Sequence, residues 1–182
     1  MRAMELLRTT RTTLRIWRDG EADRLLDLLG RWEVSRWLDD QAEPMPDRAA
    51  ALDQIAEWRA RAAGDDPLGA WAVEEQASGS VVGTVLLSAL PNGDGEVEIG
   101  WYLHPDAAGR GLATEAAAAL LAWGFAQGLV RIHCLMYVDN HPSLAVARRL
   151  GLRDQGVIFD QWYPGPSRYL KLTAAEHAAR GR

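Results

Sequence analysis

The feature that most constrains the fold is a direct passage from strand to helix in the middle of the chain. Residues 96–103 alternate between polar and apolar side chains, which is typical of a half-buried strand. A turn with Gly109 and Gly111 follows, and an alanine-rich helical run extends to about Gln127. The next apolar run, 131–138, reads as a second strand, which a helical crossover makes parallel to the first. The sequence therefore predicts a βαβ unit at the centre of the fold.

The segments on either side predict an α+β fold. Strand patterns cover residues 12–17, 69–75 and 80–89 before the central unit, and 156–159 and 168–172 after it. Helical patterns occupy 20–29, 47–63 and 142–150, with a short irregular helix in 31–40, and we expect Asp19 and Asp47 to act as N-caps. This order predicts a mixed, mostly antiparallel central sheet of about six to seven strands, with a central βαβ crossover and helices on both faces.

Length and composition indicate one domain spanning residues 1–182, with its core at about 12–173. Apolar residues make up 48% of the chain and charged residues 25%, as in ordinary globular proteins. The net charge of −5 gives no reason to expect a nucleic-acid partner. We expect no membrane segment and a cytoplasmic protein, as a monomer or homodimer, because no apolar run is long enough and Arg8 and Arg11 interrupt any signal-peptide core. Cys134 is the single cysteine and is expected in the core, and the four histidines lack metal-ligand spacing, so we expect no metal.

The glycine turn is also a candidate anion site. Gly109 and Gly111 let a ligand approach the backbone, and the free amides at a helix start favour negative charge. The expected ligand is a pyrophosphate, held by the amides of residues 109–113 with the Thr114 hydroxyl as an extra donor. The alternative is a tight turn without a ligand, since short glycine patterns often occur by chance.

Five segments carry a family resemblance in a fixed order. They are Thr13-Leu14-Arg15, the run 98–105 (Glu-Ile-Gly-Trp-Tyr-Leu-His-Pro), the run 109–116 (Gly-Arg-Gly-Leu-Ala-Thr-Glu-Ala), Asn140-His141-Pro142-Ser143 and Arg149-Leu150-Gly151-Leu152. From Thr12 to Leu172 the chain resembles the GNAT superfamily of acyl-CoA-dependent N-acetyltransferases, and within it the ribosomal-protein alanine acetyltransferase (RimJ/RimL-like) branch. The resemblance implies acetyl-CoA as acyl donor and a primary amine as acceptor.

The resemblance also implies roles for individual residues. Glu98 is the expected catalytic base, accepting a proton from the amine through water, and Ser143 is expected to protonate the departing thiolate, with Tyr137 as a weaker alternative. Without the resemblance, Glu98 reads as a solvated carboxylate, and Asn140 and Ser143 as a helix cap. The implied coenzyme-binding residues are Trp101, Tyr102, Leu103, Gly109, Arg110, Gly111, Leu112, Ala113, Thr114, Asn140 and Ser143.

The chain departs from the family pattern in two slots. Ala108 stands where the family's cradle usually opens with Gln or Arg, and Ala147 where many members carry a tyrosine acid. The segments that border the acceptor site by resemblance contain Trp37, Asp160, Trp162 and Tyr163, with Glu33 nearby, and suit an amine with apolar bulk. The acceptor stays open between a protein N-terminus and an aminoglycoside, polyamine or amino acid. A non-catalytic acyl-CoA-binding module is the alternative outside enzymes.

Overall fold

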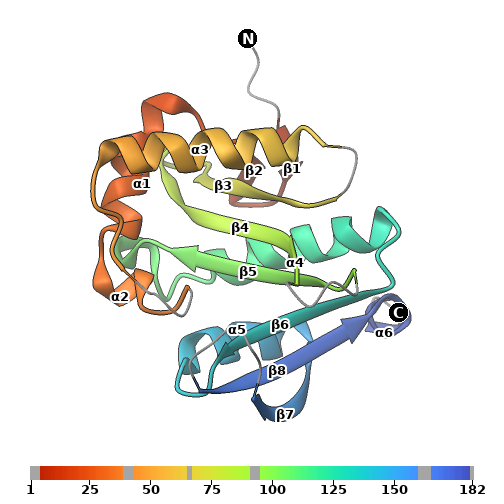
Figure 1. Cartoon of the computed structure of the whole chain (residues 1–182). Helices are drawn as coiled ribbons and strands as arrows, with labels where there is room; N and C mark the ends of the chain where they lie inside the picture. The colour runs from red at the N-terminus through yellow and green to blue at the C-terminus, as the bar shows by residue number, and fades with distance from the viewer. Residues whose placement is uncertain (1–4, 39–42, 65–66, 91–94, 160–164, 181–182) are drawn as a thin grey trace.

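The computed structural model describes residues 5–38, 43–64, 67–90, 95–159 and 165–180. Within these residues, eight strands form one sheet in the order β1-β2-β3-β4-β5-β6-β8-β7 (Figure 1). Their bounds are β1 (Glu5–Arg8), β2 (Thr12–Arg15), β3 (Gly69–Glu75), β4 (Val81–Ala89), β5 (Val97–Leu103), β6 (Arg131–Tyr137), β7 (Arg153–Phe159) and β8 (Pro166–Thr173). The pair β5–β6 is parallel and the other neighbours are antiparallel, which confirms the predicted mixed sheet.

The sheet has more strands than the six to seven expected, because β1 was not predicted from the sequence. In β1, Leu6 and Leu7 are adjacent, so its four residues show no alternation. Pairing with β2 makes this segment a strand: Leu7 lies opposite Leu14, and Arg8 lies opposite Thr13.

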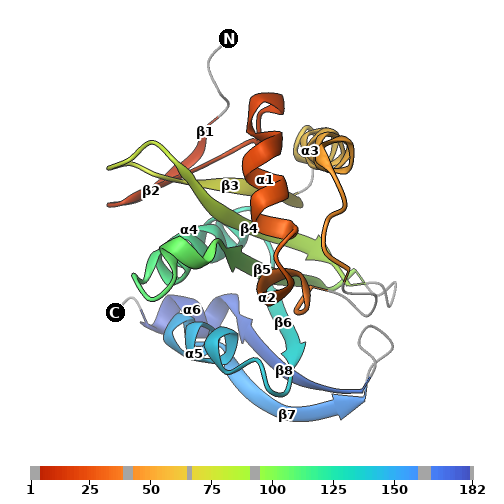
Figure 2. The ribbon, with the colours of Figure 1, turned by 90° about the vertical axis from the view of Figure 1, so that its left-hand side faces the viewer.

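Helices cover both faces of the sheet, as predicted. Figure 2 shows α1 (Ala22–Leu29), α2 (Trp32–Ser35) and α3 (Arg48–Ala62) on one face, and α4 (Leu112–Ala126) and α5 (His141–Leu150) on the other. Two short 3₁₀ turns, η1 (Asp19–Glu21) and η2 (Pro105–Ala107), and a terminal helix α6 (Ala174–Arg180) complete the elements of the described residues. None of the helices in this part of the chain is long and apolar enough to span a membrane.

The two predicted helix caps have different outcomes. Asp47 caps α3, accepting a hydrogen bond from the Ala50 amide at 2.9 Å, which confirms the prediction. The prediction for Asp19 is wrong, because this residue lies inside η1 and its carboxylate forms an ion pair with Arg59 of α3. A partner far away in the sequence therefore decides where this carboxylate points.

Alternation along β5 separates two apolar cores. Val97 and Ile99 pack with α4 and α5 in one core, whereas Tyr102 packs with α1 and α3 in the other. Because successive side chains of a strand point to opposite faces, Glu98 lies on the same face as Tyr102. This arrangement confirms the predicted alternation of polar and apolar side chains along β5.

The parallel strands β5 and β6 separate along their length. Both strands are fully described, and their register contains one partnered pair, Glu98 opposite His133. Towards their carboxyl ends the strands diverge, and α4 connects them behind the sheet (Figure 1). Glu98 therefore lies where the sheet begins to open.

Candidate active site

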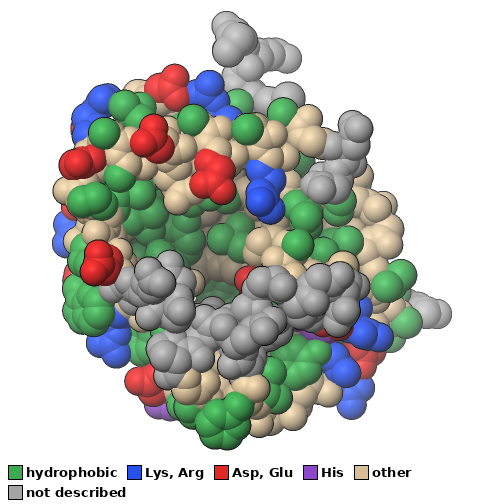
Figure 3. All heavy atoms as spheres, viewed as in Figure 1, with side chains coloured by type: hydrophobic (Ala, Val, Ile, Leu, Met, Phe, Trp, Pro, Cys, Tyr) green, Lys and Arg blue, Asp and Glu red, His purple; other side chains and the backbone are tan. Residues whose placement is uncertain are grey.

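A cavity of about 930 Å³ occupies the opening between β5 and β6. Its walls come from these strands, the turn 107–111, the first turns of α4 and α5, and the segment around α2. Figure 3 shows the molecule hollowed on this face, with hydrophobic side chains inside the hollow. The cavity therefore brings together segments that are far apart in the sequence.

The glycine turn forms one end of the cavity. Gly109 and Gly111 have φ angles of +73° and +77°, which glycine adopts without the clash that a side chain causes. A Cβ on Gly109 would meet no atom of the described residues within 4 Å, so the turn faces open space. Gly111 is the N-cap of α4 and has no side chain to occupy the first amides of the helix. We call residues 108–113 the cradle; its geometry fits an anion such as a pyrophosphate.

The cradle is fixed by residues from the other end of the sequence. The Glu115 carboxylate accepts hydrogen bonds from the Thr9 hydroxyl and the Arg11 amide, both at 2.7 Å, and from Arg11 Nε at 2.6 Å. Burial acts to raise the pKa of Glu115, but these hydrogen bonds outweigh burial and hold the pKa below its ordinary value. Glu115 is therefore charged at neutral pH and links the start of α4 to the β1–β2 turn.

Glu98 lines the cavity at the point where the two strands part. Its carboxylate is half-buried, and Ser88 Oγ, across the antiparallel pair on β4, donates a hydrogen bond to Oε1 at 3.3 Å. Burial, and then the negative charge of Glu98, raise the pKa of the Cys134 thiol on the β6 wall. A carboxylate thus lies inside the cavity, beside a thiol that stays protonated at neutral pH.

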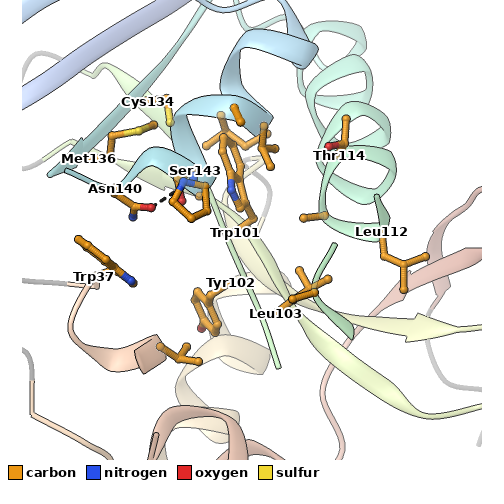
Figure 4. Close-up of a pocket in the computed structure, with 18 of the residues that line it drawn as sticks. Trp37, Trp101, Tyr102, Leu103, Leu112, Thr114, Cys134, Met136, Asn140 and Ser143 are labelled. Carbon is orange, nitrogen blue, oxygen red and sulfur yellow. Dashed lines mark hydrogen bonds between the residues drawn. The ribbon is translucent and has the colours of Figure 1, made fainter. Parts of the chain in front are cut away.

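Asn140 and Ser143 lie at the start of α5. Asn140 is buried, and its side-chain oxygen accepts a hydrogen bond from the Ser143 amide at 3.2 Å (Figure 4). This confirms the helix-capping interpretation for Asn140. Because only the backbone of Ser143 takes part in this bond, its hydroxyl is not required for the cap, and the residue also lines the cavity.

Most of the predicted site residues meet at this cavity. Lining it are Trp37, Glu98, Trp101, Tyr102, Leu103, Gly109, Gly111, Leu112, Ala113, Thr114, Asn140 and Ser143. In Figure 4, Trp37 lies on the opposite side of the cavity from Leu112 and Thr114. Arg110 is not among the described lining residues, because its side chain forms an ion pair with Glu75. Tyr137 is also absent from the described lining and packs against Trp37 in a tilted arrangement, with ring centroids 6.1 Å apart. The predicted acceptor residues Asp160, Trp162 and Tyr163 lie outside the described residues.

The cavity also contains residues that sequence reasoning missed. Two are basic, Arg11 before β2 and Arg149 near the end of α5. Leu86 and Met136 add apolar surface from β4 and β6. No local pattern marks Arg11, since the residues that bring it to the cradle are about a hundred positions away. Among the described residues, no group of three or more His, Cys, Asp or Glu side chains is arranged to hold a metal ion.

Known proteins share this sequence pattern and this fold. The family model described as "Acetyltransferase (GNAT) domain" matches residues 11–153. The "Uncharacterized N-acetyltransferase YoaA" of Bacillus subtilis (strain 168) is 26% identical over 165 residues, covering 90% of this chain and 92% of its own.

Two solved structures share the fold over almost the whole chain. RimJ from Mycobacterium smegmatis, solved with CoA-disulfide, superposes with a TM-score of 0.75 at 21% identity and covers 94% of this chain and 90% of its own. RimL, a ribosomal L7/L12 alpha-N-protein acetyltransferase solved with coenzyme A, has a TM-score of 0.78 at 17% identity and covers 92% and 97%. At these identities the two structures establish the fold alone. The family match, which spans most of the sequence, goes further: the chain belongs to the GNAT family of acetyltransferases.

Proposed function

We propose that this chain transfers an acetyl group from acetyl-CoA to a primary amine, by direct attack in a ternary complex. The observation that carries the proposal is that one cavity contains both an open cradle of helix-start amides and the carboxylate of Glu98. The first suits a diphosphate, and the second suits an incoming cation.

Acetyl-CoA as donor is supported by the relatives and by the fit of the cradle. RimJ and RimL were both solved with forms of CoA. In this chain the amides of residues 109–113 would hold the pyrophosphate, with the Thr114 hydroxyl nearby. The main chain of Trp101, Tyr102 and Leu103, on the side where β5 has left β6, would pair with pantetheine. Acetyl-CoA supplies an activated thioester; the protein holds it and prepares the amine.

Glu98 would prepare the amine by taking its proton. An α-amine titrates near pH 7.7 and a lysine near 10.4, so much of the acceptor arrives protonated and unreactive. A carboxylate inside the cavity can accept that proton through water. A backbone amide of β5 would stabilise the charge that develops on the carbonyl oxygen. As the C–S bond breaks, the Ser143 hydroxyl would donate a proton to the leaving thiolate, and the proton that Glu98 has taken from the amine would reach the hydroxyl through water. The protonated Cys134 is a poor nucleophile, which favours direct transfer over an acylated enzyme.

Release of free CoA thiol in the presence of an amine tests the proposed reaction. The panel comprises peptides with free N-termini, aminoglycosides, polyamines and amino acids. We expect turnover with at least one class, and the class identifies the acceptor. Tight CoA binding without turnover on any amine would favour the non-catalytic acyl-CoA-binding module instead.

Glu98→Gln tests the base. The substitution keeps the size of the side chain but removes proton acceptance, so kcat should fall by about 100- to 10,000-fold while the Kd for acetyl-CoA stays the same. Glu96→Gln is the matched control, because Glu96 lies just before β5, two residues from Glu98, but outside the described cavity lining, and it should retain kcat. Unchanged turnover of Glu98→Gln across the pH range would refute the role.

We further propose that the acceptor enters beside Trp37, on the side of the cavity away from the cradle (Figure 4). The contacting Trp37 and Tyr137 rings and the neighbouring Val34 and Leu38 suit an amine with an apolar substituent. The proposed setting is the cytoplasm, with a monomer or homodimer as the working form, which sedimentation of the purified chain would measure.

A further inference from the structure

We propose that Arg11 is a diphosphate ligand of the cradle, supplying the side-chain contact that the turn itself lacks; this inference rests on the proposed function. Within the cradle, the side chain of Ala108 has no hydrogen-bond donor, and the Arg110 side chain forms an ion pair with Glu75. Among the described residues that line the cavity, Arg11 and Arg149 are the basic ones. Arg149 lies on α5, whereas Arg11 lies against the cradle.

The hydrogen bonds of Arg11 fix the direction of its guanidinium group. Its Nε donates to Glu115 at 2.6 Å and its Nη1 donates to the Arg110 carbonyl at 2.9 Å. Those two bonds use two of the five N–H donors of the group. Nη2 lies 3.5 Å from the position that a Cβ on Gly111 would take. A charged planar donor is thus held beside the residue that begins the helix.

The exposure and charge of this group suit a phosphate. The Arg11 side chain is 49% exposed, so it can exchange water for a ligand without losing its protein contacts. Guanidinium groups bind phosphate oxygens with paired hydrogen bonds that are stronger than those between neutral groups. The carboxylate of Glu115 also lines the cavity and would repel a phosphate, and Arg11 neutralises it. Arg11 thus has two separable effects, a direct contact with the diphosphate and the screening of Glu115.

Calorimetric affinities for CoA and 3′-dephospho-CoA test the direct contact. Arg11→Gln should weaken both ligands by the same factor, about 10- to 100-fold, because both carry the diphosphate. Arg11→Lys, which keeps the charge without the planar fork, should recover part of the loss. Arg8→Gln is the matched control: Arg8 is also an exposed arginine of the β1–β2 hairpin, bonds to Gln76 and lies outside the described lining, so affinity should not change.

Glu115→Gln, alone and combined with Arg11→Gln, separates contact from screening. If Arg11 contacts the phosphates, the double variant stays weak; if Arg11 only screens Glu115, the double variant regains the original affinity and the proposal is overturned. A loss confined to CoA would also overturn it, since the contact would then be with the 3′-phosphate. So would affinities of Arg11→Gln within about twofold of the original. Unfolding midpoints check that each variant folds. If Arg11→Gln does not fold, the affinities of Arg11→Lys serve as the test.

The outcomes also separate this inference from the proposed function. If the unmodified protein binds neither CoA nor 3′-dephospho-CoA, the cradle assignment and the role of Arg11 are both wrong. If CoA binds normally and the affinity depends on Arg11, but no amine is acetylated, Arg11 is a phosphate ligand and the proposed acetyl transfer is wrong. If an amine is acetylated but the affinity for CoA does not depend on Arg11, only the proposed role of Arg11 is wrong.

Discussion

At the scale of single residues, the site depends on backbone conformations that few side chains tolerate. Gly111 has a positive φ and lies at the helix start, where a ligand charge would be centred. A side chain introduced at Gly111 would therefore affect the stability of the fold and the binding of the ligand through different physical causes. Conformational strain acts on the fold, whereas charge acts on the ligand.

Gly111→Asp should abolish CoA binding, because its carboxylate would face the diphosphate. Gly128→Asp is the matched control: Gly128 also has a positive φ, of +96°, at the other end of α4, and a Cβ there meets no described atom within 4 Å. Both variants should lose about 1 kcal/mol of stability from strain. Only Gly111→Asp should lose heat of CoA binding in calorimetry, and native affinity in this variant would contradict the cradle assignment.

Ser143→Ala separates the hydroxyl of Ser143 from its place in the α5 cap. The cap uses the Ser143 amide, so the unfolding midpoint should not change. If the hydroxyl protonates the thiolate, kcat should fall by about 10- to 100-fold, less than for Glu98→Gln, because a thiol of pKa near 8.5 is a tolerable leaving group unaided. Steady-state kinetics on both variants gives the comparison. A kcat of Ser143→Ala equal to or larger than that of the unmodified protein would exclude the role.

At the scale of elements, β4 and β5 are held closer than side chains allow. A Cβ on Gly83 of β4 would lie 2.3 Å from the Tyr102 carbonyl oxygen and 2.7 Å from Leu103 Cα. Both are backbone atoms of the segment that is proposed to pair with pantetheine. The glycine thus determines where the edge of the cavity runs.

Gly83→Ala should displace β5 and reduce the free energy of unfolding by about 1–3 kcal/mol, as overpacking does. The same displacement should raise the KM for acetyl-CoA. Gly20→Ala is the control, since a Cβ there meets no described atom within 4 Å and Gly20 is not among the positive-φ glycines. Urea unfolding and steady-state kinetics measure both effects; wild-type stability of Gly83→Ala would show that the strands can separate freely.

At the scale of the whole molecule, the side chain of His133 on β6 contacts both β8 and the residue that precedes β5, near the opening of the sheet. Its side chain is 1% exposed, its Nδ1 and the Tyr169 hydroxyl share a 2.7 Å hydrogen bond, and its Nε2 lies 3.3 Å from Glu96. Burial lowers the pKa of His133, Glu96 opposes this, and Arg131 and Lys171 add to the lowering. The folded protein thus holds this imidazole neutral at pH values where the unfolded chain protonates it.

This shift predicts acid-sensitive stability. Below the ordinary histidine pKa of 6.5 the unfolded chain binds more protons at this position, so stability present above pH 6.5 is lost as pH falls. The slope from one such group is at most about 1.4 kcal/mol per pH unit. His133→Gln should flatten the dependence of the unfolding free energy on pH below the ordinary histidine pKa of 6.5. Urea titrations at a series of pH values measure it, and an unchanged slope would place the titration elsewhere.

Local patterns were sufficient to predict the central βαβ unit, the glycine turn before its helix, and the face of β5 on which Glu98 lies. Each follows from short-range physics: alternation fixes which face a strand residue takes, and a glycine pair before an alanine-rich run fixes where a helix can start. The same patterns failed at β1, where the adjacent Leu6 and Leu7 break the alternation, and at Asp19, whose carboxylate binds Arg59 instead of capping a helix.

The sequence by itself thus determined the backbone path through the site and the residue types available there. Only the tertiary structure decided which charged side chains enter the cavity. Arg110 belongs to the predicted motif yet turns to Glu75, whereas Arg11 belongs to no motif yet reaches the cradle through Glu115, 104 positions away. The physical reason is that an ion pair depends on distance in space, and local periodicity carries no information about partners that the fold brings together.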